Sequence, residues 1–256
     1  MKIGVMQPYF LPYIGYFQMI EAVDKYILYS DVNFSKKGWS NRNKILLKDG
    51  AIKTITVPLA GQSSDLKINK IKIFNQTNWE QKMLSSIYTN YKGSRFFNEI
   101  YPFLETQFKN KFEYLYQLNG YLIENICSFI GIKTEIEYEH KNKYIALEEK
   151  LLDIDSGNFS QFQYKKELKP DKKVARIIEI CKSENATIYV NAIGGQELYF
   201  KKVFAEFGVD LMFIEMQEFK YQQFTHEFQP NLSIVDVLMH NGANGTKNLM
   251  QKYTLI

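Results

Sequence analysis

The sequence has few of the residues that build metal sites and disulfides, with two cysteines and three histidines in 256 residues. Cys127 and Cys181 lie far apart, inside stretches with helical periodicity, and no CxxC pair is present. A structural zinc site needs four Cys or His ligands, so the sequence predicts no metal. Both thiols are expected to be buried apolar groups.

Long apolar runs are also missing. No stretch reaches the roughly 20 apolar residues that a membrane-spanning helix needs. The N-terminal residues lack the basic segment, apolar run and cleavage site of a secretory signal peptide. The sequence therefore predicts a cytoplasmic protein without a membrane span.

Familiar catalytic motifs are absent as well: the sequence contains no GxSxG, HExxH, P-loop or GxGxxG pattern. The net charge of +4 is a mild excess, and the basic residues form no continuous stripe interleaved with aromatics. This argues against nucleic acid as a partner, unless an aminoacyl-tRNA is the donor of a transferred group. A homo-oligomer is left open.

Aromatic residues are abundant, at 15%, and they gather in the stretch MQPYFLPYIGYF at residues 6–17. Residues 2–6 read as a short buried strand, and Pro12 suits the first turn of a helix. The apolar spacing from Tyr13 to Val23 is helical, and residues 26–30 read as a second strand. Strand, helix and strand in about 30 residues predict a βαβ unit with parallel strands.

The rest of the chain continues this alternation. Further strands are expected at residues 51–59, 66–74, 134–140, 187–191 and 209–216. Three helices are expected within residues 79–131, and further helices are expected at 174–183, 198–207 and 233–240. Ser233 is expected to cap the last of these, with Asp236 as the acid of a capping box. Together they predict one α/β domain over residues 1–256, with a mainly parallel, Rossmann-like (nucleotidyltransferase-like) sheet. A helical block at about 78–131 is inserted or appended, and the polar stretch at about 141–171 reads as a linker or lid.

Ligands of open parallel sheets bind outside the carboxyl ends of the strands. Gln7 follows the first predicted strand, and Asp31 follows the second. The helix that begins near Tyr13 would point its free N–H groups at the same crevice, where Tyr13 to Gly15 would suit a phosphate. The alternative is that the two prolines shape a turn while the aromatics fill the core.

The loop at residues 31–44 carries four cations against a single acid, Asp31. Arg and Lys suit phosphate groups, and an exposed aromatic face suits a sugar or a base. The alternative is a solvated basic loop. The candidate ligand-binding residues here are Lys36, Lys37, Trp39, Asn41 and Arg42.

A third candidate is the turn with Gly194 and Gly195, between a predicted strand and a helix. It lacks the full spacing of a phosphate-binding motif, and an ordinary turn explains it equally well. With Tyr199, Tyr221 and Gln223, these glycines would form the opposite wall of the crevice.

With these motifs in hand, the chain resembles the WbqC-like family. The resemblance rests on MQPYFLPYIGYFQMI, YSDVNFSKKGWSNRNKI, YVNAIGGQELY and YQQFTHEFQPNLSIVDVLMHNG, and it spans nearly the whole chain. The stretch 141–171 is longer than expected of the family. The resemblance implies a role in O-antigen, lipopolysaccharide or other surface-polysaccharide biosynthesis. One activity it implies is attachment of an amino-acid or acyl group to the amine of a nucleotide-linked 4-amino-4,6-dideoxy sugar.

The first strand, loop and helix are also laid out like the start of HIGH-type nucleotidyltransferases and pantothenate synthetase. There, two histidines cradle the ATP phosphates, and here Tyr13 and Tyr16 stand near their positions. Tyrosine supplies no cationic imidazole, so the similarity supports a nucleotide-binding crevice rather than adenylation chemistry.

The favoured hypothesis is a cytoplasmic transferase that acts on a nucleotide-linked amino sugar. Asp31 is the candidate general base, with Gln7 and Tyr16 orienting the amine, while Tyr9 or Trp39 covers the sugar or base. The second substrate would be an activated acyl or aminoacyl donor, or ATP. The alternatives are an ATP-dependent ligase or nucleotidyltransferase, and a non-catalytic scaffold that binds nucleotide sugars.

Overall fold

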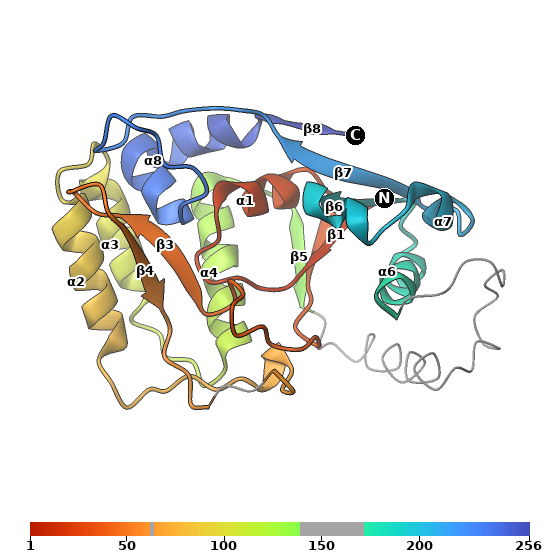
Figure 1. Ribbon diagram of the computed structural model, residues 1–256, viewed down its shortest axis with the longest axis horizontal. Coiled ribbons are helices and arrows are strands. Elements are labelled where there is room, and N and C mark those ends of the chain that lie inside the picture. Colours follow the sequence, from red (N-terminus) through yellow and green to blue (C-terminus); the bar gives the residue numbers. More distant parts are fainter. Residues whose placement is uncertain (62–63, 139–171) are drawn as a thin grey trace.

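A computed structural model describes residues 1–61, 64–138 and 172–256, so the predicted linker or lid at 141–171 lies outside the described residues. In this part of the chain a six-stranded sheet has the order β5-β2-β1-β6-β7-β8 (Figure 1). Neighbouring strands are parallel, except that β8 runs antiparallel to β7. The α/β, mainly parallel fold predicted from the sequence is confirmed. The strands are β1 (Lys2–Met6), β2 (Lys25–Leu28), β5 (Glu135–Tyr138), β6 (Ile188–Ala192), β7 (Asp210–Met216) and β8 (Tyr253–Leu255).

The predicted βαβ unit is β1, helix α1 (Ile14–Glu21) and β2. Seven of the eight residues of α1 are buried, so the helix is apolar on nearly every side. Gly4 lets the Tyr26 ring of β2 approach the backbone of β1, because a Cβ there would lie 2.9 Å from that ring.

The sheet opens between β1 and β6. These strands pair only as far as Gly4 with Val190, whereas β1 stays paired with β2 up to Met6 and β6 stays paired with β7 up to Ala192. The chain moves from β1 to β2 on one side and from β6 to β7 on the other, so the strand order reverses here. A switch of this kind is where open α/β sheets bind their ligands.

Helices cover both faces of the sheet (Figure 1). One face packs on α1, α4 and α8, and the other packs on α6 and α7. The helical block predicted near 78–131 is α2, α3 and α4. Besides α1, the helices are α2 (Trp79–Tyr91), α3 (Phe97–Gln107), α4 (Leu115–Ile130), α6 (Lys172–Ser183), α7 (Lys201–Ala205) and α8 (Ile234–Met250).

Two segments differ from the sequence prediction in the first half of the chain. Arg42–Leu46 is strand β3, which pairs with β4 (Ile52–Thr56) as a separate hairpin, although the sequence predicts a loop as far as residue 44. Residues 66–74 are not a strand but carry a 3-10 turn, η1 (Ile68–Lys70). The backbone of this segment donates instead to single carbonyls of Val32, Ser30 and Glu113, so tertiary contacts override the alternating pattern.

The second half differs in three places. The helix predicted at 198–207 is shorter, because a 3-10 turn, η2 (Ile193–Glu197), comes first. Helix α8 continues past His240 to Met250, through a break at Gly242. Ser233 caps α8 as predicted, but Asp236 does not complete a capping box, because the Ser233 N–H donates to Lys44 and the Asp236 carboxylate is bound elsewhere.

Candidate functional site

Buried side chains hold the loop between β1 and α1, residues 7–13, in a strained conformation. Leu11 has a φ of 42°, in the left-handed region that non-glycine residues rarely adopt. The Asn43 side-chain amide donates to the Leu11 carbonyl at 2.7 Å and to the Phe10 carbonyl at 3.1 Å. Ser233 Oγ donates to the same Leu11 carbonyl at 2.8 Å. Strain that the surrounding structure enforces in this way is typical of functional sites.

A second buried amide joins this loop to the loop that follows β2. Asn119 of α4, fully buried, donates to the Pro8 carbonyl at 2.8 Å and to the Ser40 carbonyl at 2.7 Å. The Phe10 N–H donates to the Trp39 carbonyl at 3.0 Å. The two motifs that the sequence singles out therefore lie side by side at the open end of the sheet.

Tyrosines form the floor beneath the 7–13 loop. Tyr16 is 3% exposed, and its hydroxyl donates to the Gln7 carbonyl at 2.8 Å. The Tyr9 ring lies on Tyr16, with centroids 5.5 Å apart. Burial raises the pKa of Tyr9, Tyr13 and Tyr16, so all three are neutral hydroxyls at physiological pH. Tyr16 thus holds the backbone of Gln7, while Gln7, Tyr9 and Tyr13 are partly exposed.

The start of α1 is more enclosed than the phosphate-binding site that the sequence predicts there. Gly15 is buried, and a Cβ there would collide with the Tyr13 ring and with Met216 Sδ at the end of β7. Of the predicted phosphate-binding stretch, Tyr13 is the part that remains partly exposed.

Asp31 lies at the edge of the crevice, after β2, with both carboxylate oxygens engaged. Oδ2 accepts from Lys67 Nζ at 2.5 Å, and Oδ1 accepts from Asn69 Nδ2 at 3.1 Å. The Asp31 side chain is 19% exposed. Within the described residues each oxygen accepts from one side chain, so each keeps acceptor capacity for a ligand.

The basic residues of the second loop divide into surface and internal groups. Lys36 and Lys37 are exposed. Arg42 donates through Nη2 to the Lys36 carbonyl, while its buried Nε has no partner. Within the described residues Arg42 forms no ion pair with an acid. Its charge is thus available to an anion.

The two other predicted residues of this loop have different environments. Trp39 is 41% exposed, with the ammonium of Lys44 5.5 Å from its ring centroid. Asn41 is 1% exposed and donates to the Val57 carbonyl at 3.1 Å. Trp39 is therefore presented to a ligand, whereas the amide of Asn41 holds the loop to the hairpin.

The η2 turn stands across the crevice, after β6. A Cβ on Gly194 would meet open space, whereas one on Gly195 would collide with Asn191 Nδ2. Tyr199 packs against Tyr189 and Phe204, on the α7 face of the sheet. Gly194 is thus the more open of the two glycines.

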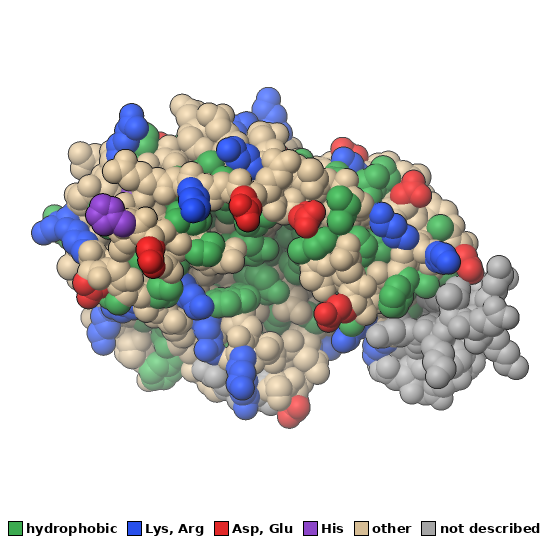
Figure 2. All heavy atoms as spheres, turned by 45° about the horizontal axis from the view of Figure 1, so that its top comes forward, with side chains coloured by type: hydrophobic (Ala, Val, Ile, Leu, Met, Phe, Trp, Pro, Cys, Tyr) green, Lys and Arg blue, Asp and Glu red, His purple; other side chains and the backbone are tan. Residues whose placement is uncertain are grey.

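Figure 2 shows a hollow near the middle of one face of the molecule, with hydrophobic side chains on its floor. Lys and Arg side chains lie along one rim, on the side where Figure 1 draws the loop before β3, and hydrophobic side chains line the wall on the η2 side. The hollow lies over the region of α1 and the end of β1, as expected of a crevice at the switch point.

The remaining two predicted residues belong to a different, buried cluster. Asp236, fully buried, accepts from Tyr221 at 2.7 Å, Gln223 at 2.9 Å and Tyr91 at 2.8 Å. His240 lies 3.9 Å from the same carboxylate, and burial lowers its pKa. This cluster fastens residues 221–229 to α8, and the structure does not join Tyr221 and Gln223 to the residues of the two loops.

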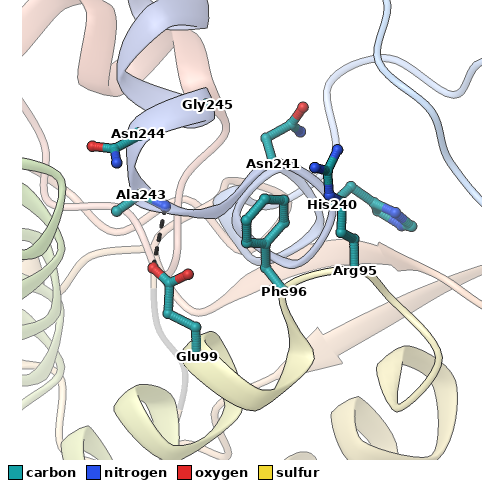
Figure 3. Close-up of a pocket in the computed structure, with 8 residues that line it drawn as sticks. All are labelled: Arg95, Phe96, Glu99, His240, Asn241, Ala243, Asn244 and Gly245. Atoms are coloured by element: carbon teal, nitrogen blue, oxygen red, sulfur yellow. Dashed lines mark hydrogen bonds between the residues drawn. The ribbon is translucent and has the colours of Figure 1, made fainter.

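A second hollow, with a volume of about 450 Å³, lies at the break in α8. Gly242 has a φ of 65°, and Phe96 occupies the space that a Cβ would need. In Figure 3, Phe96 lies between Glu99 and Arg95, and Glu99 accepts from the Ala243 N–H at 3.5 Å. The protein's own carboxylate thus caps the new helix start, and none of the candidate catalytic or ligand-binding residues named from the sequence lines this hollow.

Three residues that position the site were not named from the sequence: Asn119, Lys67 and Asn69. Asn119 did carry a signal, because it is a carboxamide between the apolar Leu118 and Leu122 of a helix. Lys67 and Asn69 carried none, since residues 66–74 read as a strand.

Two comparisons with known proteins found matches. The model of the WbqC-like protein family matches residues 7–248, from the first loop to the last turn of α8. A protein of Mycobacterium tuberculosis named "Uncharacterized protein Rv1507c" is 27% identical over 248 residues, which cover 94% of each chain. No solved structure matches. Within the described residues, no helix is long and apolar enough to cross a membrane. The extent of the family match shows that this chain belongs to the WbqC-like protein family.

Proposed function

We propose that the crevice at the ends of β1 and β6 binds a nucleotide-linked amino sugar, and that the protein is a cytoplasmic transferase that attaches an acyl or aminoacyl group to the sugar's amine. Membership of the WbqC-like family suggests a role related to polysaccharide biosynthesis. The observation that carries the proposal is the joining of the two motif loops by Asn119 at the switch point of the sheet.

The diphosphate lies against the basic loop. Within the described residues the Arg42 guanidinium forms no ion pair, and it lies beside the exposed Lys36. Lys37 is exposed as well, and Asp31 is the single acid among residues 31–44. Arg binds phosphate oxygens in pairs, and Lys adds point charges. Trp39 and Tyr9 provide aromatic faces for the sugar or the base.

Asp31 acts as the general base. The amine nitrogen attacks the carbonyl carbon of an activated acyl group, and a C–N bond forms. The bond between the carbonyl carbon and the leaving group breaks, and the leaving group departs with the electron pair of that bond. The Asp31 carboxylate accepts the proton that the amine loses, while Lys67 and Asn69 hold it in place. Gln7 orients the amine, and Tyr16 acts through Gln7 as a positioning residue.

Calorimetric titration tests this binding model. The ligands are a UDP- or dTDP-linked 4-amino-4,6-dideoxy sugar, the matching sugar without the amine, and ATP. We expect the amino sugar to bind most tightly, Asp31→Asn to remove the preference for the amine, and Lys48→Ala, an exposed cation of the hairpin, to change nothing. Tighter binding of ATP than of either sugar would instead favour an ATP-dependent ligase.

A further inference from the structure

The second hollow, at the break in α8, is lined by one cation and one acid, Arg95 and Glu99, together with the carboxamides of Asn241 and Asn244. Arg95 and Glu99 are both exposed, and among the described residues neither of them forms an ion pair. The hollow therefore presents two opposite charges that do not neutralise each other directly.

The break in α8 keeps these two charges apart. Gly242 has a φ of 65° and a ψ of −176°, a backbone conformation that is essentially restricted to glycine. The Phe96 ring fills the space beside it, since a Cβ on Gly242 would lie 2.6 Å from that ring, and the Phe96 N–H donates to the Met239 carbonyl at 3.1 Å. In Figure 3, Phe96 stands between Arg95 and Glu99. The fixed ring thus separates two side chains that would be neighbours if they stood four positions apart on one helix.

Both charged groups keep hydrogen-bonding capacity for a ligand. The Arg95 guanidinium lies 5.3 Å from the centroid of the Phe96 ring, and within the described part of the chain its N–H groups donate to no protein acceptor. Glu99 accepts one long bond through Oε1, from the Ala243 N–H at 3.5 Å, and its Oε2 accepts none from the residues described. A guanidinium offers paired donors that match a carboxylate, and a carboxylate oxygen accepts from an ammonium group.

The two charges select the class of ligand. An anion that Arg95 attracts is repelled by Glu99, and a cation that Glu99 attracts is repelled by Arg95. A molecule that carries both a carboxylate and an ammonium group satisfies both side chains. The volume of about 450 Å³ lies toward the lower end of the range for small-molecule sites, which favours a small ligand.

We propose that this hollow binds a free α-amino acid, with its carboxylate on Arg95, its ammonium group on Glu99 and its side chain along the Phe96 ring. The inference is independent of the proposed function, because no residue assigned to the nucleotide-sugar crevice lines the hollow. It also gives the break in α8 a role, since Gly242 leaves the room that Phe96 needs between the two charges.

Three compounds with the same carbon body test the two charges separately. L-leucine carries both groups, 4-methylpentanoate lacks the ammonium group, and 3-methylbutylamine lacks the carboxylate. Each is titrated into the full-length protein while backbone amide NMR signals are followed. The variants are Arg95→Gln and Glu99→Gln. Their controls are Lys92→Gln and Glu105→Gln, which remove exposed charges that do not line the hollow.

We expect L-leucine to shift the signals of residues 95–99 and 240–245 saturably. Each single-charge compound should bind about tenfold more weakly, because one charge-assisted contact is missing. Arg95→Gln should weaken leucine binding and remove its advantage over 3-methylbutylamine, whereas Glu99→Gln should remove its advantage over 4-methylpentanoate. The two control variants keep the wild-type affinities.

Four results would overturn the inference. Equal affinity for leucine and 4-methylpentanoate would make the hollow an anion site, and equal affinity for leucine and 3-methylbutylamine would make it a cation site. Equal losses in the charge variants and their controls would show an effect of net charge alone. The fourth is the lack of saturable shifts in residues 95–99 and 240–245 at tens of millimolar leucine. The comparison of the three compounds needs only the wild-type protein, so it decides the question even if a variant fails to fold.

Discussion

The side chain of Asn119, in the middle of a helix, donates a 2.8 Å hydrogen bond to the carbonyl of Pro8, 111 residues earlier in the chain. Its second N–H donates to Ser40, so one carboxamide fixes the distance between the two loops that form the candidate site. Both bonds are inaccessible to water, and buried carbonyls that lose their donors are costly.

Replacing Asn119 by Ala is therefore expected to lower the free energy of unfolding by about 2–4 kcal/mol, because two buried carbonyls lose their donor. Urea unfolding measures this loss. Asn125→Ala is the matched control, since Asn125 lies on the same helix and, among the residues that the structure describes, donates to the Tyr121 carbonyl of that helix rather than to a distant loop. Equal losses in the two variants would contradict the role assigned to Asn119.

Arg42→Ala is expected to weaken binding of the nucleotide-linked amino sugar by about 10- to 100-fold, since a charge-assisted pair of hydrogen bonds to phosphate is lost. The dependence of affinity on salt should become shallower as well. Calorimetry at two salt concentrations measures both effects, and Lys48→Ala controls for overall charge. An unchanged affinity would remove Arg42 from the site.

His240 should make the protein less stable in acid. Burial lowers its folded-state pKa below the ordinary value of about 6.5, so the unfolded chain binds its proton at a higher pH than the folded chain. As the pH falls from about 7 toward 5, the unfolding free energy of the wild type should decrease relative to that of His240→Phe. Urea unfolding across this range measures it. A shift in favour of the wild type would mean that the Asp236 carboxylate dominates and raises the pKa.

The two thiols should be inert in the folded protein. Burial raises the pKa of the Cys181 thiol to about 12 and raises that of Cys127 further. The thiolate is the reactive form, so a chromogenic disulfide reagent at pH 8 should find almost no reactive thiol until urea unfolds the chain, and then two. Rapid reaction of one equivalent with native protein would contradict this environment.

The sequence predicted those elements of the fold that the periodic spacing of apolar residues determines. The β1–α1–β2 unit, the three helices after Trp79 and the strand at Asp210–Met216 follow from apolar spacing. The strand predicted at residues 66–74 was wrong, because this segment with alternating Lys and Ile forms isolated bridges to distant parts of the chain instead of a strand. The pattern of one segment does not show which partner its backbone will find.

The position of the candidate residues after strand ends could be predicted from the sequence, but the contacts among them could not. Gln7, Asp31 and Gly194 follow strand ends, and that rule needs only the sequence. The engagement of Asp31 by Lys67, and of Leu11 by Asn43, joins residues more than 30 positions apart. Tyr221 and Gln223 show the same limit, since their partner Asp236 read as a helix cap.

The most direct test of the central claim is a backbone amide NMR titration of the full-length protein with a UDP- or dTDP-linked 4-amino-4,6-dideoxy sugar. We predict saturable shifts in residues 7–13 and 36–42, reduced by Arg42→Ala, with no shifts around Arg95 and Gly242 at the second hollow. Shifts confined to the second hollow, or no shifts at millimolar ligand, would contradict a nucleotide-sugar site at the ends of β1 and β6.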